Sequence, residues 1–143
     1  MEDKTPTTPA EWLQFKARFY KILERGLCAG TGNRDGRMCI EAAICASLDL
    51  PHGDNPSCVD PAVRAFKIRL NDSRWSSPEA RAKGLRELGI AQVGSKGKIK
   101  SNEFSTLVSI KTVNTLLPPL FEEIFPKNVA CLKAVKKCQE ACQ

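Results

Sequence analysis

The sequence predicts an all-α protein, folded as a single compact domain of about six or seven helices. Apolar residues recur three and four positions apart through most of the chain, which is the spacing of one face of an α-helix. Capping residues and prolines stand where these stretches begin, and no alternating strand pattern of useful length occurs. With 143 residues, 42% of them hydrophobic, the chain has the composition of one globular domain over 1–143, in which we expect residues 1–7 to be a flexible tail.

The first helix is predicted from residue 9 to about residue 25. Thr8 and Glu11 have the spacing of a capping box, and Pro9 occupies the first helical position. The apolar residues that follow at helical spacing are Trp12, Phe15, Phe19, Ile22 and Leu23.

A glycine-rich loop, residues 26–37, follows this helix and leads into a short predicted helix over about 38–48. Its glycines permit the positive φ angles that turn backbone amides toward one point, and Arg34 and Arg37 lie where an anion would arrive. The loop is therefore a candidate phosphate cradle, although no strand precedes it and the Gly-Lys-Ser/Thr of a P-loop is missing. The alternative is a connector whose glycines end one helix and start the next.

Two further helices are predicted to begin at Asp60-Pro61 and at Ser77-Pro78, and to run to about residues 70 and 89. The stretch 90–101 is short, basic and interrupted by glycine, so we expect an exposed connection or a small hairpin there.

The C-terminal part is predicted to hold a long helix over about 102–117, ended by Pro118-Pro119, and a last helix capped by Asn128. Three cysteines of this last helix, Cys131, Cys138 and Cys142, fall on one helical face. Free cysteine behaves as a small hydrophobic residue, so we expect this face to be a buried stripe.

Positive charge is concentrated in the middle of the chain. Residues 64–100 hold ten Lys and Arg against three Asp and Glu, whereas residues 1–63 hold seven against nine and residues 101–143 five against four. Such a local excess favours an anionic partner, either nucleic acid or a phosphorylated small molecule. The alternative is a solvated face, which explains the charge but not the scarcity of acids in this segment.

The predicted anion-binding face includes one side of the third helix, where Arg64, Lys67 and Asn71 recur at helical spacing opposite an apolar side. Trp75 stands within the segment and either stacks on a base or fills the corner between the third and fourth helices. The residues predicted to contact the ligand are Arg34, Arg37, Arg64, Lys67, Arg74, Lys96, Lys98 and Lys100.

Cysteine usage favours the cytoplasm. The seven cysteines are an odd number, they include no Cys-x-x-Cys pair, and the polar N-terminal stretch does not read as a secretory signal. We therefore expect free thiols, no metal site and no membrane partner. The sequence indicates no particular cofactor.

A cysteine-dependent enzyme is the first alternative function, with Cys39 and His52 as its candidate catalytic residues. Cys39 lies in the first turn of a predicted helix, where the helix dipole should lower the thiol pKa, and His52 is the only histidine. A helix over 38–48 separates its ends by roughly 15 Å, so the two meet only if that helix is shorter or the following loop folds back along it. A second alternative is a structural or adaptor subunit of a larger assembly.

Overall fold

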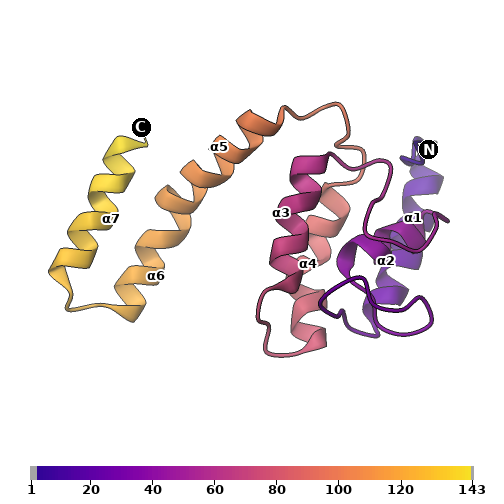
Figure 1. The fold of residues 1–143 in the computed structure, drawn as a ribbon, viewed down its shortest axis with the longest axis horizontal. Coiled ribbons are helices and arrows are strands. Elements are labelled where there is room, and N and C mark those ends of the chain that lie inside the picture. Colours follow the sequence, from indigo (N-terminus) through magenta and orange to yellow (C-terminus); the bar gives the residue numbers. More distant parts are fainter. Residues whose placement is uncertain (1–2, 143) are drawn as a thin grey trace. The chain divides into compact units, whose positions relative to one another are not determined.

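The computed structural model describes residues 3–142, and this part of the chain is helical, with two isolated β-bridges and no strand (Figure 1). The predicted all-α class is confirmed. The chain divides into two compact units, Met1–Ile99 and Lys100–Gln143, here called unit 1 and unit 2. Each unit is described by itself, and a single domain over 1–143 stays a prediction.

Unit 1 is built around its shortest helix. α2 contacts the other three helices of the unit, and seven of its eight residues are buried. The composition of the helix favours this position, because it is rich in alanine and isoleucine and carries one charged side chain. The helices of unit 1 are α1 (Pro9–Leu23), α2 (Ile40–Ser47), α3 (Pro61–Asp72) and α4 (Pro78–Ala91).

Three helices of unit 1 begin at caps that the sequence predicts. Thr8 and Glu11 form the capping box of α1, the Asp60 side chain accepts from Ala62 N, and the Ser77 side chain accepts from Ala80 N. The start of α2 differs from the prediction, because Cys39 is its N-cap and lies outside the first helical turn.

Glycines on α4 allow its neighbours to approach closely. A Cβ atom on Gly84 would lie 2.4 Å from the Trp75 ring, and one on Gly89 would lie 2.6 Å from Phe19 of α1. The Trp75 Nε1 also donates to Leu70 O at 2.9 Å. Trp75 therefore fills the corner between α3 and α4 and is not a free stacking platform.

The connection after α4 is less exposed than the sequence suggests. Residues 92–95 are buried, and Cys58 O accepts from both Gly94 N and Lys96 N. The prediction of an exposed connection holds only for the residues from Lys96 onward, because the backbone before it is bonded to the loop that carries Cys58.

Unit 2 is a long interrupted helix followed by a second helix that packs against it. Asn128 caps the second helix, as predicted, by accepting from Cys131 N. Val135 is the one buried residue among the described residues of this unit. Its elements are α5 (Ser101–Lys111), the π-helix η1 (Thr112–Leu116), α6 (Leu117–Ile124) and α7 (Val129–Ala141).

Pro118 and Pro119 do not end the long helix, contrary to the prediction. They occupy the first turn of α6, directly after the π-helical segment, in which the N–H of Leu117 still donates to Thr112 O. The carbonyl of Asn114, four residues before Pro118, instead accepts from the Gln139 Nε2 of α7 at 3.4 Å. The N–H donor that Pro118 lacks is thus replaced, at the carbonyl of Asn114, by a side chain from the neighbouring helix.

None of the described helices combines the length and apolar character that crossing a bilayer would require.

Candidate functional site

The inward face of α3 is polar, which corrects the prediction for this helix. Val63, Lys67 and Asn71 are buried, whereas Phe66 and Leu70 are half-buried. Lys67 and Asn71 therefore do not face a partner in solution. The spacing of apolar residues in α3 predicted the wrong inward face, because unit 1 supplies buried polar partners for Lys67 and Asn71. Glu41 is the partner of Lys67.

Glu41, Lys67 and Gln92 form a buried polar cluster between α2, α3 and the end of α4. Their side chains are 0%, 2% and 3% exposed. The Gln92 Nε2 donates to both carboxylate oxygens of Glu41, at 3.0 and 2.9 Å. The Lys67 Nζ lies 3.9 Å from Glu41 Oε1 and has no hydrogen-bond acceptor among the described residues. Lys67 and Glu41 thus compensate each other's charge without an ideal hydrogen bond.

Burial disfavours the charged form of both members of this pair. It lowers the pKa of Lys67 from 10.5 to about 8, although the Glu41 carboxylate opposes that shift. Burial also raises the pKa of Glu41, against the attraction of Lys67 and the hydrogen bonds from Gln92. Oppositely shifted pKa values in one cluster are found at functional sites and in structural ion pairs alike.

Asn71 joins the glycine-rich loop to the start of α2. Its Oδ1 accepts from Ile40 N at 3.2 Å, and its Nδ2 donates to Cys28 O at 2.9 Å. The next residue, Asp72, accepts from Gly30 N at 2.8 Å. These amides are bound by side chains of α3, so they are not directed at an external anion, and this geometry does not support the loop as a phosphate cradle.

A cavity of about 50 Å³ lies between the glycine-rich loop, the start of α2 and the end of α3. It brings together the thiol of Cys39, the carboxyl groups of Glu41, Asp54 and Asp72, and the amide of Asn71. This acidic lining suits a water molecule or a small hydrogen-bond donor better than a phosphate.

The expected low pKa of the Cys39 thiol is wrong. Cys39 is 4% exposed, and burial raises the pKa of its thiol to about 11, even though the amides of Glu41 and Ala42 act in the opposite direction. Its Sγ accepts from Ala42 N at 3.3 Å as the cap of α2. Cys39 is a structural cap in this environment, and its thiolate is disfavoured.

His52 is exposed in the loop after α2, and its Nε2 lies 3.3 Å from Gly32 O. It therefore contacts the glycine-rich loop, whereas Cys39 is buried. The contact joins the two loops, and no hydrogen bond links His52 to Cys39 within the described part of the chain.

The remaining predicted ligand residues fall into two groups. Arg37, Arg64 and Lys100 have acidic partners, at 3.6 Å from Glu79, 3.4 Å from Asp54 and 3.0 Å from Glu103. Arg34, Arg74, Lys96 and Lys98 are exposed and form no ion pair within the described part of the chain.

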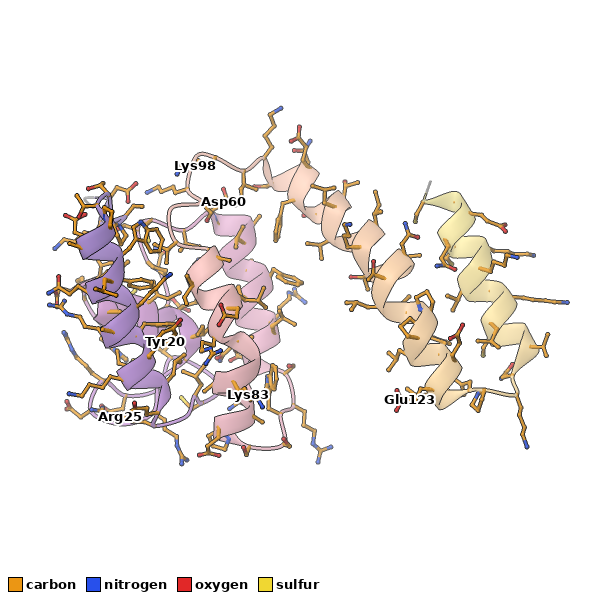
Figure 2. The ribbon with its side chains drawn as sticks, turned by 180° about the vertical axis from the view of Figure 1, so that it is seen from behind. Tyr20, Arg25, Asp60, Lys83, Lys98 and Glu123 are labelled. Atoms are coloured by element: carbon orange, nitrogen blue, oxygen red, sulfur yellow. The ribbon has the colours of Figure 1, made fainter. Side chains whose placement is uncertain are left out.

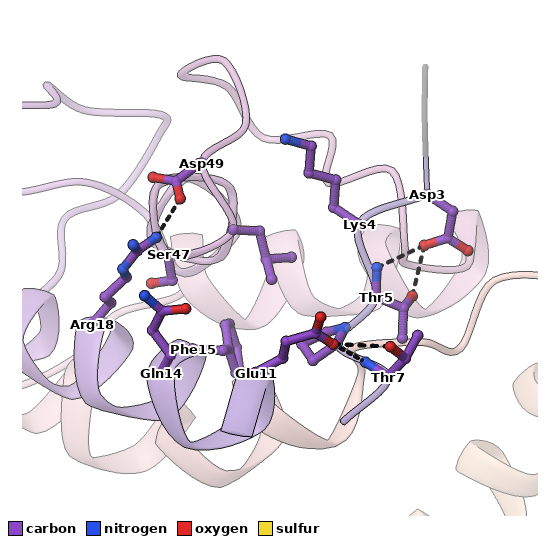
Figure 3. A pocket seen from close by; sticks show the side chains of 12 residues that line it. Asp3, Lys4, Thr5, Thr7, Glu11, Gln14, Phe15, Arg18, Ser47 and Asp49 are labelled. Carbon is purple, nitrogen blue, oxygen red and sulfur yellow. Dashed lines mark hydrogen bonds and ion pairs between the residues drawn. The ribbon is translucent and has the colours of Figure 1, made fainter. Parts of the chain in front are cut away.

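A cavity at the N-terminal side of α1 contains none of the predicted residues. This cavity of about 430 Å³ lies between residues 3–7, α1 and the end of α2 (Figure 3). Arg18 pairs with Asp49 at one side, while Glu11 accepts from Thr7 and Thr8 at the other. Arg18 and Asp49 thus pair with each other, while Asp3 and Glu11 accept hydrogen bonds from Thr5 and Thr7, as the dashed lines in Figure 3 show.

Sequence reasoning missed Glu41 and Gln92. One signal was available for Glu41, because it is the lone charge in the apolar stretch Cys39–Ser47 and such a charge needs a buried partner. Gln92 gave no comparable signal in a segment with ordinary loop composition. We found no protein-family model, curated protein or solved structure that matches this chain.

Proposed function

We propose that unit 1 binds an extended polyanion, of which nucleic acid is the principal example, through exposed cations of α3, α4 and the loop after α4. The proposal rests on one observation about residues 64–98. Their acidic side chains are bonded within the chain, whereas several of their basic side chains are exposed and form no ion pair in the described structure. Glu79 pairs with Arg37, Glu87 pairs with Arg86, and Asp72 is turned to the glycine-rich loop. The exposed cations of this segment that form no ion pair in the described structure are Arg69, Arg74, Lys83, Lys96 and Lys98.

The distribution of these cations favours a long ligand over a single phosphate. Lys83 lies on α4, whereas Lys98 lies beyond the C-terminal end of that helix, in the loop that leads to residue 100 (Figure 2). Arg74 precedes α4 in the chain and Lys98 follows it, and this 14-residue helix extends over roughly 21 Å. Cations spread over such a length match a chain of phosphates, each contact adding an electrostatic contribution.

Lys96 and Lys98 are the most direct residues with which to test this binding. Both are exposed, and both help to lower the pKa of Asp3 after the larger effect of the hydrogen bonds from Thr5. Their positive potential therefore reaches neighbouring groups in the folded chain.

The test measures fluorescence anisotropy of a labelled DNA duplex with the full chain. We expect wild-type affinity to fall steeply between about 50 and 200 mM salt because binding releases counterions. Lys96→Glu/Lys98→Glu should weaken binding by roughly tenfold or more and reduce the salt slope. Lys21→Glu/Lys111→Glu is the control, since it makes the same charge change at exposed positions outside the segment. An affinity that does not change with salt concentration would contradict the proposal. So would a control variant that lowers the affinity as much as Lys96→Glu/Lys98→Glu does.

A further inference from the structure

Residues 3–7 form a short segment that is bound to unit 1 before α1 begins. Pro6 is buried, and the Glu11 carboxylate accepts from Thr7 N at 2.7 Å and from Thr8 N at 3.0 Å. These hydrogen bonds join the backbone of the segment to the first turn of α1. The segment therefore has a defined position on unit 1.

Thr5 holds the side chain of Asp3 within this segment (Figure 3). Asp3 Oδ1 accepts from Thr5 N at 2.9 Å and from Thr5 Oγ1 at 2.6 Å. Hydrogen bonds to an ionised carboxylate are stronger than those between neutral groups, so they favour the charged form of Asp3 in one orientation. Lys4 points away from Asp3 in the same view and forms no ion pair with it in the described structure.

Thr5 also brings the segment to the loop after α4. A Cβ atom on Gly94 would lie 2.9 Å from Thr5 Cγ2 and 3.8 Å from Lys98 Nζ. The side chains of Thr5 and Lys98 therefore approach the same side of Gly94. Glycine, with a φ of +78° here, leaves room for both of them. Asp3 is bonded to Thr5 and is thus placed beside the basic part of this loop.

The charges of Lys96 and Lys98 act on Asp3 across this contact. Hydrogen bonds from the Thr5 side chain and backbone lower the pKa of Asp3 most, and the two positive charges lower it further. Neither lysine forms an ion pair in the described structure, and both are exposed. Because an electrostatic attraction acts on both partners, Asp3 in turn lowers the positive potential around the two lysines.

Resting on the polyanion binding proposed above, we propose that Asp3 is a built-in competitor that limits the affinity of Lys96 and Lys98 for a phosphate backbone. While Thr5 holds it, the Asp3 carboxylate is a fixed anion beside the two lysines, and it repels a phosphate that approaches them. Release of Asp3 from Thr5 therefore increases the affinity. The effect is largest at low salt, because mobile ions screen charges over about 10 Å at 0.1 M salt.

The first experiment measures the affinity of the full chain for the labelled DNA duplex by fluorescence anisotropy. Asp3→Asn keeps the shape of the side chain and removes its charge, so it should bind about two- to fivefold more tightly than the wild type at about 50 mM salt. The gain should shrink toward about 200 mM salt. Asp35→Asn is the matched control, because Asp35 is exposed in the glycine-rich loop, which is bonded to the start of α4 and not to its end.

A double-mutant cycle tests whether the effect passes through the two lysines. In a Lys96→Gln/Lys98→Gln background, Asp3→Asn should change the affinity no more than Asp35→Asn does, because the charges that Asp3 screens are then absent. The remaining exposed cations of α3 and α4 keep DNA binding measurable in this background.

Thr5→Val tests the positioning of Asp3 without changing any charge. Valine keeps a methyl group against Gly94 and removes the hydroxyl that donates to Asp3. We expect a gain in affinity that is smaller than that of Asp3→Asn, because the hydrogen bond from Thr5 N is retained. The gain should be absent when Asp3→Asn is already present. An unchanged affinity for Thr5→Val would overturn the positioning of Asp3 by Thr5.

The results distinguish this inference from the polyanion proposal on which it rests. A wild-type affinity that does not depend on salt would overturn both. Salt-dependent binding that Asp3→Asn increases no more than Asp35→Asn does would overturn the inference alone. A gain from Asp3→Asn that persists in the Lys96→Gln/Lys98→Gln background would also overturn it, because Asp3 would then act through other cations.

Discussion

Cys39 shows how a local rule and its surroundings compete at one residue. A helix N-terminus stabilises a nearby negative charge by about 0.3–1 kcal/mol at exposed positions. Burial instead raises the pKa of this thiol from 9.0 to about 11, and each pKa unit corresponds to about 1.4 kcal/mol. Burial is the larger effect, so the thiol stays protonated. Nucleophilic chemistry at this position is disfavoured for the same reason.

The order of cysteine alkylation should therefore follow exposure. Cys138 is exposed on α7, whereas Cys39, Cys45 and Cys58 are buried and burial raises the pKa of each. We expect a mild alkylating reagent at neutral pH to label Cys138 first and the three buried thiols last, as measured by peptide mass spectrometry. In denaturant all seven should react at similar rates. Labelling of Cys39 as fast as Cys138 would contradict the buried cap.

The exposure of Cys138 also corrects the expected buried stripe of the last helix. Cys131 and Cys142 are half-buried, and only Val135 on this helix is buried. Helical spacing placed these residues on one face, but spacing does not supply the surface that would cover it.

Lys67 is the residue at which a single substitution should be most informative. Lys67→Met removes the cation beside Glu41 and should cost about 3–5 kcal/mol, because it leaves a buried carboxylate without a compensating charge. The double variant Glu41→Gln/Lys67→Met should recover much of this loss, since neither remaining side chain is charged. Urea unfolding of the wild type and the two variants measures the difference. Equal losses in the single and double variants would show that packing, not charge, governs the site.

At the scale of the element, α3 is joined to the rest of unit 1 by polar groups on its buried face. Asn71 binds a carbonyl of the glycine-rich loop and the first amide of α2, while Lys67 reaches Glu41. In unit 2, Gln139 of α7 binds the carbonyl that Pro118 cannot serve. In both units a helix is completed by side chains from another helix.

Asn71→Leu should therefore destabilise unit 1 through more than one element. The change leaves Cys28 O and Ile40 N without their Asn71 partners, which should cost about 1–3 kcal/mol for each group that stays unsatisfied. Hydrogen exchange should become faster in the glycine-rich loop and at the start of α2. Asn55→Leu is a suitable control because Asn55 is exposed. Unchanged exchange in the loop would show that the loop is held without Asn71.

At the scale of the whole molecule, the buried ionisable groups set how stability depends on pH. Folding raises the pKa of Cys39 to about 11 and of Cys45 to about 12, from 9.0. Their contribution to the free energy of unfolding is complete below about pH 9. It is lost as the pH rises through the pKa values of the folded state, because the unfolded chain releases these protons first. Lys67 has the opposite effect. Folding lowers its pKa, so its contribution raises the free energy of unfolding as the pH rises from about 8 to 10.5.

The thiols outnumber the lysine, so we expect the free energy of unfolding to fall above about pH 9. Cys39→Ala/Cys45→Ala should reduce the slope of that fall, even if the variant is less stable at every pH because of the space it leaves. Urea midpoints measured from pH 7 to 11 give the slopes. Parallel curves for the wild type and the variant would contradict the role of these two thiols.

Local sequence signals determined the class of this protein and most of its helices. The capping box at Thr8, the proline starts at Asp60 and Ser77, and the cap at Asn128 act within one helical turn, so they can be recognised without knowledge of the fold. The concentration of basic residues in 64–100 is likewise a property of the sequence alone.

The tertiary structure decided which of the polar residues are available for function. Lys67 and Asn71 have the spacing of a solvent-facing stripe, yet Glu41 and the glycine-rich loop enclose them. Pro118 and Pro119 are typical of a helix end, yet the helix continues through them, and Gln139 binds the carbonyl of Asn114. In each case the deciding partner is distant in sequence, and the free energy of burying a polar group depends on whether that partner is present.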